Sequence, residues 1–310
     1  MRKLGGLTGV LARMTGMRVG VIDVGSNTVR LLVATVAGDE VRSVREERQH
    51  LGLGEEILLH GRVRSSKLDE VREVTGEYAR IARKLGVRDL ETVVTAPGRQ
   101  GSSPEHLVDV IRRATAGDVR VVSAEEEGRL AFSGAVSRAN PGEGVVAVCD
   151  VGGGSTEVVV GTELIGPAWV RSVDLGSLRL TASLLHGNPP TGAEIDDART
   201  AVRSGLAALA PPQPEIALAT GGSARAVARV VGHEYGPGEL ERLVDVLASR
   251  PAAESANALG IRPDRARTLL AGALILEEVS RLLGQPFTPS RGGIREGAAL
   301  RLAARHAAAA

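Results

Sequence analysis

Two stretches of this chain, 127 residues apart, repeat one pattern of apolar and small polar positions. Val21–Val33 and Val148–Val160 each run from an apolar segment, through Asp-Val-Gly and a few small polar residues, into a second apolar segment. Short apolar runs separated by such residues are typical of two strands joined by a tight turn. The repetition predicts a duplicated fold in which two β-hairpins hold one ligand from opposite sides.

The rest of the pattern alternates strands with helices along the first half and becomes rich in helices along the second. Strands are expected at 18–24, 28–37, 40–46, 90–95, 119–122, 144–151, 156–161, 168–174 and 216–219. Helices are expected at 65–86, from 103, from 123, and at 176–186, 192–209, 222–231, 237–249, 263–284 and 294–308. This alternation predicts an α/β fold with mixed sheets. The turn-rich segment 139–144 places a domain boundary within 132–144.

Composition narrows the class of protein. A chain of 310 residues has room for two domains, and with only 2% aromatic residues its core must be aliphatic. A net charge of +1 gives no global attraction to nucleic acid or to a membrane, so neither is expected as a partner. A polyanion would therefore have to be held by a local cluster of arginines. No apolar run approaches the ~20 residues of a membrane span.

Two further features of the sequence bear on the cellular compartment and on the role of the first 16 residues. The single Cys149 lies in an apolar strand, which predicts a buried structural thiol and a reducing, cytoplasmic setting. Residues 1–16 make a poor secretory leader because glycines and Arg13 interrupt them. They are expected to form a mobile leader, or translation begins at Met17.

The two predicted turns suit phosphate. In the first, Gly25, Ser26, Asn27 and Thr28 offer backbone amides and short donors; an ordinary hairpin turn explains them too. In the second, three adjacent glycines exceed what a hairpin needs, so close approach of a ligand to the main chain explains them better. That second loop consists of Gly152, Gly153, Gly154, Ser155 and Thr156.

Acidic residues flank the second loop. Asp150 and Glu157 would repel a phosphate unless a cation lay between them, and Mg²⁺ with oxygen ligands is the natural choice. The alternative is that both carboxylates accept hydrogen bonds from loop amides. The six His residues show no metal-ligand spacing, so a zinc site is not expected.

A run of three glutamates begins the helix expected from Ser123. Ser123 and Glu126 match a capping box, which would engage Glu126 at the helix terminus. Glu127 points about 100° away around the helix. It is either a general base or part of a solvated acidic first turn, which helix dipoles favour.

Other residues that could donate hydrogen bonds to a phosphate lie just after the ends of predicted strands. Arg99 follows one strand, and its planar guanidinium suits bidentate contact with phosphate, although an ordinary surface arginine is the alternative. Gly222 and Ser223 open a helix after another strand, where an anion can bind or a plain Gly-Ser cap can form.

These motifs resemble the exopolyphosphatase/guanosine pentaphosphate phosphatase (Ppx/GppA) family from residue 18 to about 303. The most specific string is Asp150-Val-Gly-Gly-Gly-Ser-Thr-Glu157. The supporting strings are Asp23-Val-Gly-Ser-Asn-Thr28, Ser123-Ala-Glu-Glu-Glu-Gly-Arg-Leu130, Thr220-Gly-Gly-Ser223 and Gly293-Ile-Arg-Glu-Gly297. The resemblance implies two duplicated ribonuclease H-like domains of the actin and sugar-kinase superfamily, with an interdomain cleft.

The resemblance also assigns roles. It implies domains at 17–133 and 134–310, with the last helix packing back on the first domain. It aligns Glu127 with the catalytic glutamate, Arg99 with a phosphate-binding arginine, and places Glu157 in the active site. A homodimer is implied as well, and in the sequence only the apolar helix 269–283 supports it. Arg267 stands where many relatives have Asp.

Three functions remain open. The first is metal-assisted, in-line attack of water that removes the terminal phosphate from inorganic polyphosphate, or the 5′-γ-phosphate from guanosine pentaphosphate. The second is an ATP-dependent kinase or ATPase of the same fold, with a nucleoside pocket near 220–223. The third is a non-catalytic sensor of polyphosphate or nucleotide. Some longer members of the family carry extra C-terminal helical domains, whereas this sequence ends near Arg305, so less surface is expected for holding a long polymer during repeated cleavage.

Overall fold

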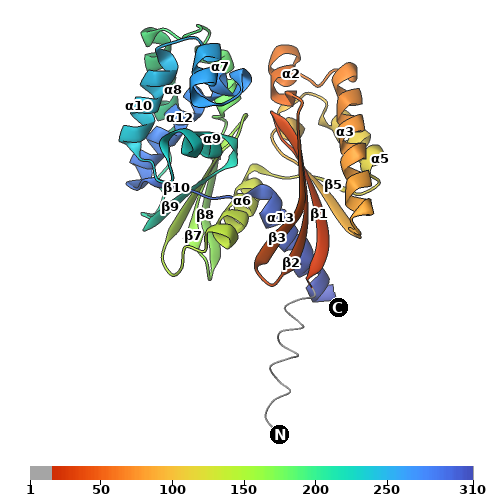
Figure 1. The fold of residues 1–310 in the computed structure, drawn as a ribbon. Helices are drawn as coiled ribbons and strands as arrows, with labels where there is room; N and C mark the ends of the chain where they lie inside the picture. Colours follow the sequence, from red (N-terminus) through yellow and green to blue (C-terminus); the bar gives the residue numbers. More distant parts are fainter. Residues whose placement is uncertain (1–15, 310) are drawn as a thin grey trace.

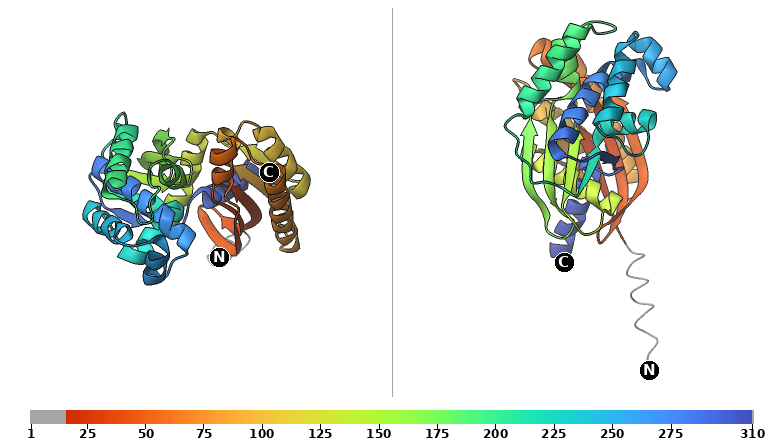
Figure 2. Two further views of the ribbon diagram at one scale, coloured as in Figure 1. Left: turned by 90° about the horizontal axis from the view of Figure 1, so that it is seen from above. Right: turned by 90° about the vertical axis from the view of Figure 1, so that its left-hand side faces the viewer.

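The computed structural model describes residues 16–309, so the leader expected at 1–16 lies, apart from Gly16, outside the described residues. Two lobes stand side by side, each built on its own sheet (Figures 1 and 2). The first sheet contains β1 (Met17–Val24), β2 (Thr28–Ala37), β3 (Glu40–His50), β4 (Asp89–Val94) and β5 (Asp118–Val121). The second contains β6 (Val146–Val151), β7 (Thr156–Thr162), β8 (Gly166–Val173), β9 (Ile216–Thr220) and β10 (Phe287–Pro289).

The two sheets have one topology. Their strand orders are β3-β2-β1-β4-β5 and β8-β7-β6-β9-β10. In each, the first three strands form an antiparallel meander and the last two add in parallel. The duplication predicted from the repeated pattern is therefore present in the strand order as well as in the two hairpins.

Helices cover both sheets. The first lobe carries α2 (Leu53–His60), α3 (Ser65–Lys84), α4 (Pro97–Gln100) and α5 (Pro104–Thr115). The second carries α7 (Ser177–Leu184), α8 (Gly192–Leu206), α9 (Gly221–Val231), α10 (Pro237–Ala248), α11 (Ala252–Leu259) and α12 (Pro263–Leu283). The core is aliphatic, as the composition predicts, and α12 lies at its centre with Leu269, Ile275 and Val279 fully buried.

Two further helices exchange places between the lobes. α6 (Ala124–Ala139) follows the first sheet in sequence, yet Phe132 and Val136 pack against the second sheet. α13 (Ile294–Ala309) follows the second sheet, yet Ala298 and Leu302 pack against the first. Figure 1 shows both helices between the two sheets. Because α6 continues to Ala139, the turn-rich part of the expected boundary segment begins only after this helix.

The exchanged helices cross at glycines. A Cβ on Gly134 of α6 would lie 2.0 Å from the carbonyl oxygen of Gly293. A Cβ on Gly297 of α13 would lie 2.0 Å from the carbonyl oxygen of Leu130. Backbone therefore touches backbone at this crossing, an approach that side chains larger than hydrogen do not permit.

Several elements were missed or shortened in the prediction. β3 continues to His50 rather than stopping at 46, because this edge strand is almost wholly exposed and charged and so lacks an apolar alternation. The helices α2, α4 and α11 and the three-residue β10 were not predicted, because each is too short to establish a period. All the other expected helices and strands are present.

Candidate functional site

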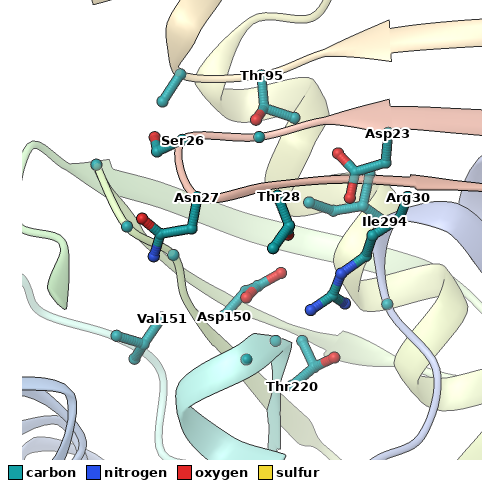
Figure 3. Close-up of a pocket in the computed structure, with 18 of the residues that line it drawn as sticks. Asp23, Ser26, Asn27, Thr28, Arg30, Thr95, Asp150, Val151, Thr220 and Ile294 are labelled. Carbon is teal, nitrogen blue, oxygen red and sulfur yellow. The ribbon is translucent and has the colours of Figure 1, made fainter. Parts of the chain in front are cut away.

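A cavity of about 120 Å³ lies between the lobes, where the turns of the two repeated hairpins meet (Figure 3). The hairpin turns contribute Gly25, Ser26, Asn27, Thr28, Gly152, Gly153, Gly154 and Ser155. The surrounding elements contribute Asp23, Arg30, Arg48, Thr95, Ala96, Glu127, Asp150, Val151, Ser177, Thr220, Gly221, Gly222, Arg225, Arg265, Gly293, Ile294, Arg295 and Glu296. A space of this size and polarity fits a small anionic group.

The turn between β1 and β2 presents its amides to this cavity. Its carbonyl oxygens are engaged elsewhere: the Asn27 carbonyl accepts from the amides of Leu51 and Gly52, and the Ser26 carbonyl accepts from Gly54 at 2.7 Å. Among the described residues, the amides of Ser26 and Asn27 donate to no backbone carbonyl. Consecutive amides in a tight turn that donate to no carbonyl can bind an anion, so this turn is suited to hold one.

The turn between β6 and β7 repeats this design. Its Gly152 amide donates to the Ser155 carbonyl at 3.0 Å, as Gly25 donates to Thr28 at 3.1 Å in the first turn. The carbonyls of Gly152 and Gly153 accept from amides at the start of α7, at 2.9 to 3.1 Å. The amides of Gly153 and Gly154 donate to no backbone carbonyl within the described chain. In both turns, amides at or just before the start of a later helix bind the turn's carbonyls and leave the turn's amides available to a ligand.

The two turns also touch each other. A Cβ on Gly153 would lie 3.0 Å from the Cβ of Ser26, and one on Gly154 would lie 3.0 Å from the Ser26 hydroxyl. The Gln100 side-chain amide of the first lobe donates to Asp174 of the second at 3.1 Å. Glycine at 153 and 154 is therefore required by the approach of the opposite turn, in addition to any ligand.

Glu127 reaches the cavity from the first turn of α6. Its side chain is 8% exposed, and its Oε2 lies 2.8 Å from Nη1 of Arg99. The same nitrogen donates to the Val122 carbonyl at 2.9 Å, so one guanidinium group contacts both the carboxylate and the backbone just before α6. Burial raises the pKa of Glu127 to about 7, while the Arg99 charge opposes the rise. A carboxyl with a pKa near neutrality can accept a proton efficiently.

The helix start forms half of the predicted capping box. The Ser123 hydroxyl accepts from the Glu126 amide at 3.1 Å. The prediction that the Glu126 side chain also binds the start of this helix is wrong. The carboxylate pairs with Arg120 at 2.8 Å and with Arg301 of α13. These long-range partners, which local sequence cannot reveal, compete successfully for the carboxylate.

Two aspartates face each other across the cavity from equivalent strands, Asp23 on β1 and Asp150 on β6 (Figure 3). Burial raises the pKa of both, that of Asp150 to about 6. Asp23 Oδ1 is buried and has no hydrogen-bond partner among the described residues. A Cβ on Gly221, whose φ is +84°, would lie 2.2 Å from Asp150 Oδ1, so only glycine fits there.

Glu157 lies outside the cavity lining. It is buried, its Oε1 accepts from the Ser172 hydroxyl at 2.8 Å, and burial raises its pKa, as do the nearby Glu127 and Asp150. No cluster of three or more His, Cys, Asp or Glu side chains with metal-binding geometry occurs in the described part of the chain. A divalent ion would therefore rely on one or two carboxylates, completed by waters and phosphate oxygens, as Mg²⁺ commonly does.

A cluster of arginines supplies the positive charge. Arg30, Arg48, Arg225, Arg265 and Arg295 all line the cavity. Figure 3 shows Arg30 extending from β2 toward Asp150 and Thr220. Burial lowers the pKa of Arg30 to about 9, and repulsion from Arg225 and Arg295 adds to the effect. The low net charge led us to expect that a polyanion would need a local cluster of arginines. The sequence did not indicate which arginines would form it.

Most of the residues predicted to bind phosphate meet at this cavity, and three do not line it. Arg99 turns toward Glu127, the Thr156 hydroxyl donates to the Leu175 carbonyl, and Ser223 is buried beside Gly272. Among the missed residues, Asp23, Thr220 and the 293–296 segment belong to motifs that sequence analysis quoted without giving them a role.

Other predictions can be placed too. Cys149 is buried, as predicted, and burial raises the pKa of its thiol well above the ordinary value. Arg267 lies away from the cavity, among the residues around Thr181 and Leu185. The apolar residues of 269–283 fill the core of the second lobe, so this helix gives no support for a homodimer, which stays a prediction. None of the described helices is long and apolar enough to span a membrane.

Comparisons with known proteins agree with these features. A model of the Ppx/GppA phosphatase family matches residues 32–306. Exopolyphosphatase 1 of Mycobacterium tuberculosis is 29% identical over 303 residues, covering 92% of this chain and 88% of that protein. Exopolyphosphatase 2 of the same species is 29% identical over 316 residues, covering 92% and 98%.

Solved structures share the whole architecture. The crystal structure of the Aquifex aeolicus member of the Ppx/GppA family has a TM-score of 0.82 at 25% identity, covering 94% of this chain and 99% of that one. An exopolyphosphatase from Cytophaga hutchinsonii has a TM-score of 0.84 at 21% identity, covering 93% and 98%. Together with the repeated sheets, this likeness confirms the predicted fold of two duplicated actin-like domains.

Proposed function

Since the chain belongs to the Ppx/GppA phosphatase family and is by class an exopolyphosphatase, we propose that it removes the terminal phosphate of inorganic polyphosphate by in-line attack of water. The observation that carries this proposal is the arrangement of one buried carboxylate, Glu127, beside two anion-binding turns. Hydrolysis of guanosine pentaphosphate is the finer alternative for the same site.

The two turns would hold the terminal phosphates. Amides of Ser26, Asn27, Gly153 and Gly154 would donate to phosphate oxygens, and Arg30 would balance their charge. Phosphoryl transfer proceeds through a loose transition state, so positioning and charge neutralisation provide most of the catalysis. The contact between the two turns supports this role because a ligand bound by both is fixed relative to both lobes.

Glu127 would act as the general base. A water between Glu127 and the terminal phosphorus would attack as its proton passes to the carboxylate. The bond between that phosphorus and the bridging oxygen would break, and its electron pair would remain on the leaving chain. No phosphorylated protein side chain is required. The pKa of about 7 supports this role because the carboxylate is then both available and basic at neutral pH.

A divalent cation fits the acidic side of the cavity. Asp150 would hold it, with Asp23 the second candidate because its Oδ1 lacks a partner among the described residues. When bound, Mg²⁺ would neutralise charge on the phosphate oxygens. Its presence would also relieve the repulsion between buried carboxylates. Ligation by Glu157 stays a prediction.

The direct test is phosphate release from inorganic polyphosphate, guanosine pentaphosphate and ATP, each with Mg²⁺ and with a chelator. We expect release from polyphosphate that depends on Mg²⁺ and little release from ATP. Turnover of ATP alone would favour the kinase or ATPase hypothesis. Tight binding of polyphosphate without any release would favour a sensor. Either result would contradict the proposed hydrolysis.

The raised pKa of Glu127 predicts a pH profile. Only the deprotonated base is active, so kcat/KM should rise through about pH 7 and level off above it. Arg99→Gln removes the positive charge that lowers this pKa, so the midpoint should move to higher pH. Arg129→Gln, on the exposed face of the same helix, serves as the control and should leave the midpoint in place. Glu127 would be excluded as the base if the midpoint of the pH profile of kcat/KM lay near pH 4.5, or if Arg99→Gln left that midpoint unchanged.

A further inference from the structure

Charged side chains from four elements of the chain form a closed ring beside the start of α6. The members of this charge ring are Glu91 on β4, Arg120 on β5, Glu126 in the first turn of α6 and Arg301 on α13. Arg301 contacts Glu91 Oε2 through Nη2 at 2.7 Å, and Glu126 Oε1 through Nη1. Arg120 contacts the same two carboxylates, at 3.4 Å and 2.8 Å. Each guanidinium group therefore bridges both glutamates.

The two glutamates of the charge ring differ in burial. The side chain of Glu91 is fully buried, and a buried carboxylate is costly unless cations compensate it, so Glu91 requires its arginines. The side chain of Glu126 is 28% exposed and could be hydrated instead. Its contacts are thus not needed to neutralise it, and their effect is to tie the first turn of α6 to Glu91 of the first sheet.

This link matters because the rest of α6 belongs to the other lobe. Phe132 and Val136 pack against the second sheet, whereas Glu127, the neighbour of Glu126, lines the cavity between the lobes. Arg99 holds the carboxylate of Glu127 at 2.8 Å, and the charge ring holds the backbone from which that side chain extends. The start of α6 is therefore fixed to the first lobe, although its later turns follow the second.

We propose that Arg301 is a positioning residue for the general base: through the charge ring it fixes the start of α6, and so places the carboxylate of Glu127 against the attacking water. This proposal rests on the proposed function for the role of Glu127. Arg301 is not among the described residues that line the cavity, so it acts on turnover rather than on affinity. A displacement of about 1 Å in a catalytic group can lower a rate about 100-fold.

Two substitutions open the charge ring at different points. Arg301→Lys keeps a positive charge for Glu91 but lacks the fork that lets one side chain reach two carboxylates. Glu126→Ala keeps the helix cap, because Ser123 accepts from the backbone amide of residue 126. We expect either substitution to lower kcat for polyphosphate about 10- to 100-fold and to change KM by less than about twofold. The double variant should be no slower than the slower single variant, because both break one linkage.

The matched control is Arg305→Lys. Arg305 also lies on α13 and contacts Glu91, at 3.7 Å, but its interactions within the described part of the chain do not include Glu126. This variant should leave kcat and KM unchanged. In a Glu127→Gln background, Arg301→Lys should cause no further fall in kcat, because the group that it positions can no longer accept a proton.

Hydrogen exchange provides a measurement that needs no turnover. The amides of residues 126–128 should exchange about tenfold faster in Arg301→Lys and in Glu126→Ala than in wild type, while those in the last turns of α6 keep their rates. Arg305→Lys should exchange like wild type throughout α6. These rates report directly whether Arg301 holds the start of the helix.

The proposal would be overturned by an unchanged kcat in Arg301→Lys and Glu126→Ala, by a rise in KM as large as the fall in kcat, or by an equal loss in Arg305→Lys. A further fall in kcat in the Glu127→Gln background would also overturn it, since Arg301 would then act on another part of the protein. If no substrate releases phosphate, the proposed function fails, and the exchange rates still decide whether Arg301 fixes the start of α6.

Discussion

Glu127→Gln is expected to lower kcat for polyphosphate by about 10²- to 10⁴-fold while leaving binding largely intact. Glutamine keeps the size and hydrogen-bonding capacity of the side chain but cannot take the proton from water. Because glutamine occupies nearly the same volume and can still accept from Arg99, 2.8 Å from the carboxylate, the surrounding turns should keep their conformation. Steady-state kinetics together with calorimetric binding would separate a loss of turnover from a loss of affinity.

A neighbouring glutamate provides the control. Glu125 lies in the same helical turn, is exposed and pairs with Arg129. Glu125→Gln should retain full turnover, since it removes the same charge without touching the cavity. If Glu127→Gln retains activity comparable with that control, another group accepts the proton.

The same substitution should change how stability depends on pH. The pKa of Glu127 is about 7 in the folded protein and 4.5 in an exposed chain. Between these values the unfolded chain has released the proton while the folded protein still holds it, so this carboxyl lowers stability progressively as pH rises. Its cost above pH 7 is up to about 3 kcal/mol. The Tm of Glu127→Gln, relative to wild type, should therefore increase between pH 5 and pH 8.

Gly134→Ala is expected to destabilise the protein by about 3 kcal/mol. The added Cβ would lie 2.0 Å from the Gly293 carbonyl oxygen and 2.7 Å from the Gly297 amide nitrogen, and both are backbone atoms that cannot rotate away. The helices α6 and α13 would have to separate. Since Glu127 stands on α6, activity should fall together with Tm. Thermal and urea denaturation followed by circular dichroism would measure the loss.

A second helical glycine gives the matched comparison. Gly205 of α8 is exposed, and a Cβ there would meet only Leu175, at 3.8 Å. Gly205→Ala should stabilise the protein by about 0.4–1 kcal/mol, because alanine lowers the entropy of the unfolded chain. Equal effects of the two substitutions would show that the helices at the crossing separate without cost.

The turns were predictable because their chemistry is local. Three adjacent glycines have few explanations other than close approach, and the second copy of the pattern made an isolated turn improbable. The place of Glu127 in the first helical turn followed from the preceding serine, but local sequence left a solvated acidic turn open, and the resemblance to the family singled out Glu127. These features depend on residues within one hairpin or one helical turn, where spacing in sequence converts directly into spacing in the structure.

The arginine cluster was not predictable for the opposite reason. Arg30, Arg225 and Arg265 come from β2, α9 and α12, and only the packing of both lobes brings them together. The chain has 38 lysines and arginines, and nothing in local spacing separates these from the rest. α2 was missed as well, although the amides around its start hold the carbonyls of the first turn. Its glycine-bounded eight residues are too few to show a period.

The exchange of α6 and α13 also determines when the protein can finish folding. The first sheet is made early during synthesis, but the face that receives Ala298 and Leu302 has no cover until α13 has been synthesised. The aliphatic face around Val19 and Leu32 must remain without this partner while the whole second lobe is synthesised. Synthesis that stops before α13 would thus give a chain that has both hairpin turns but an uncovered, aggregation-prone sheet.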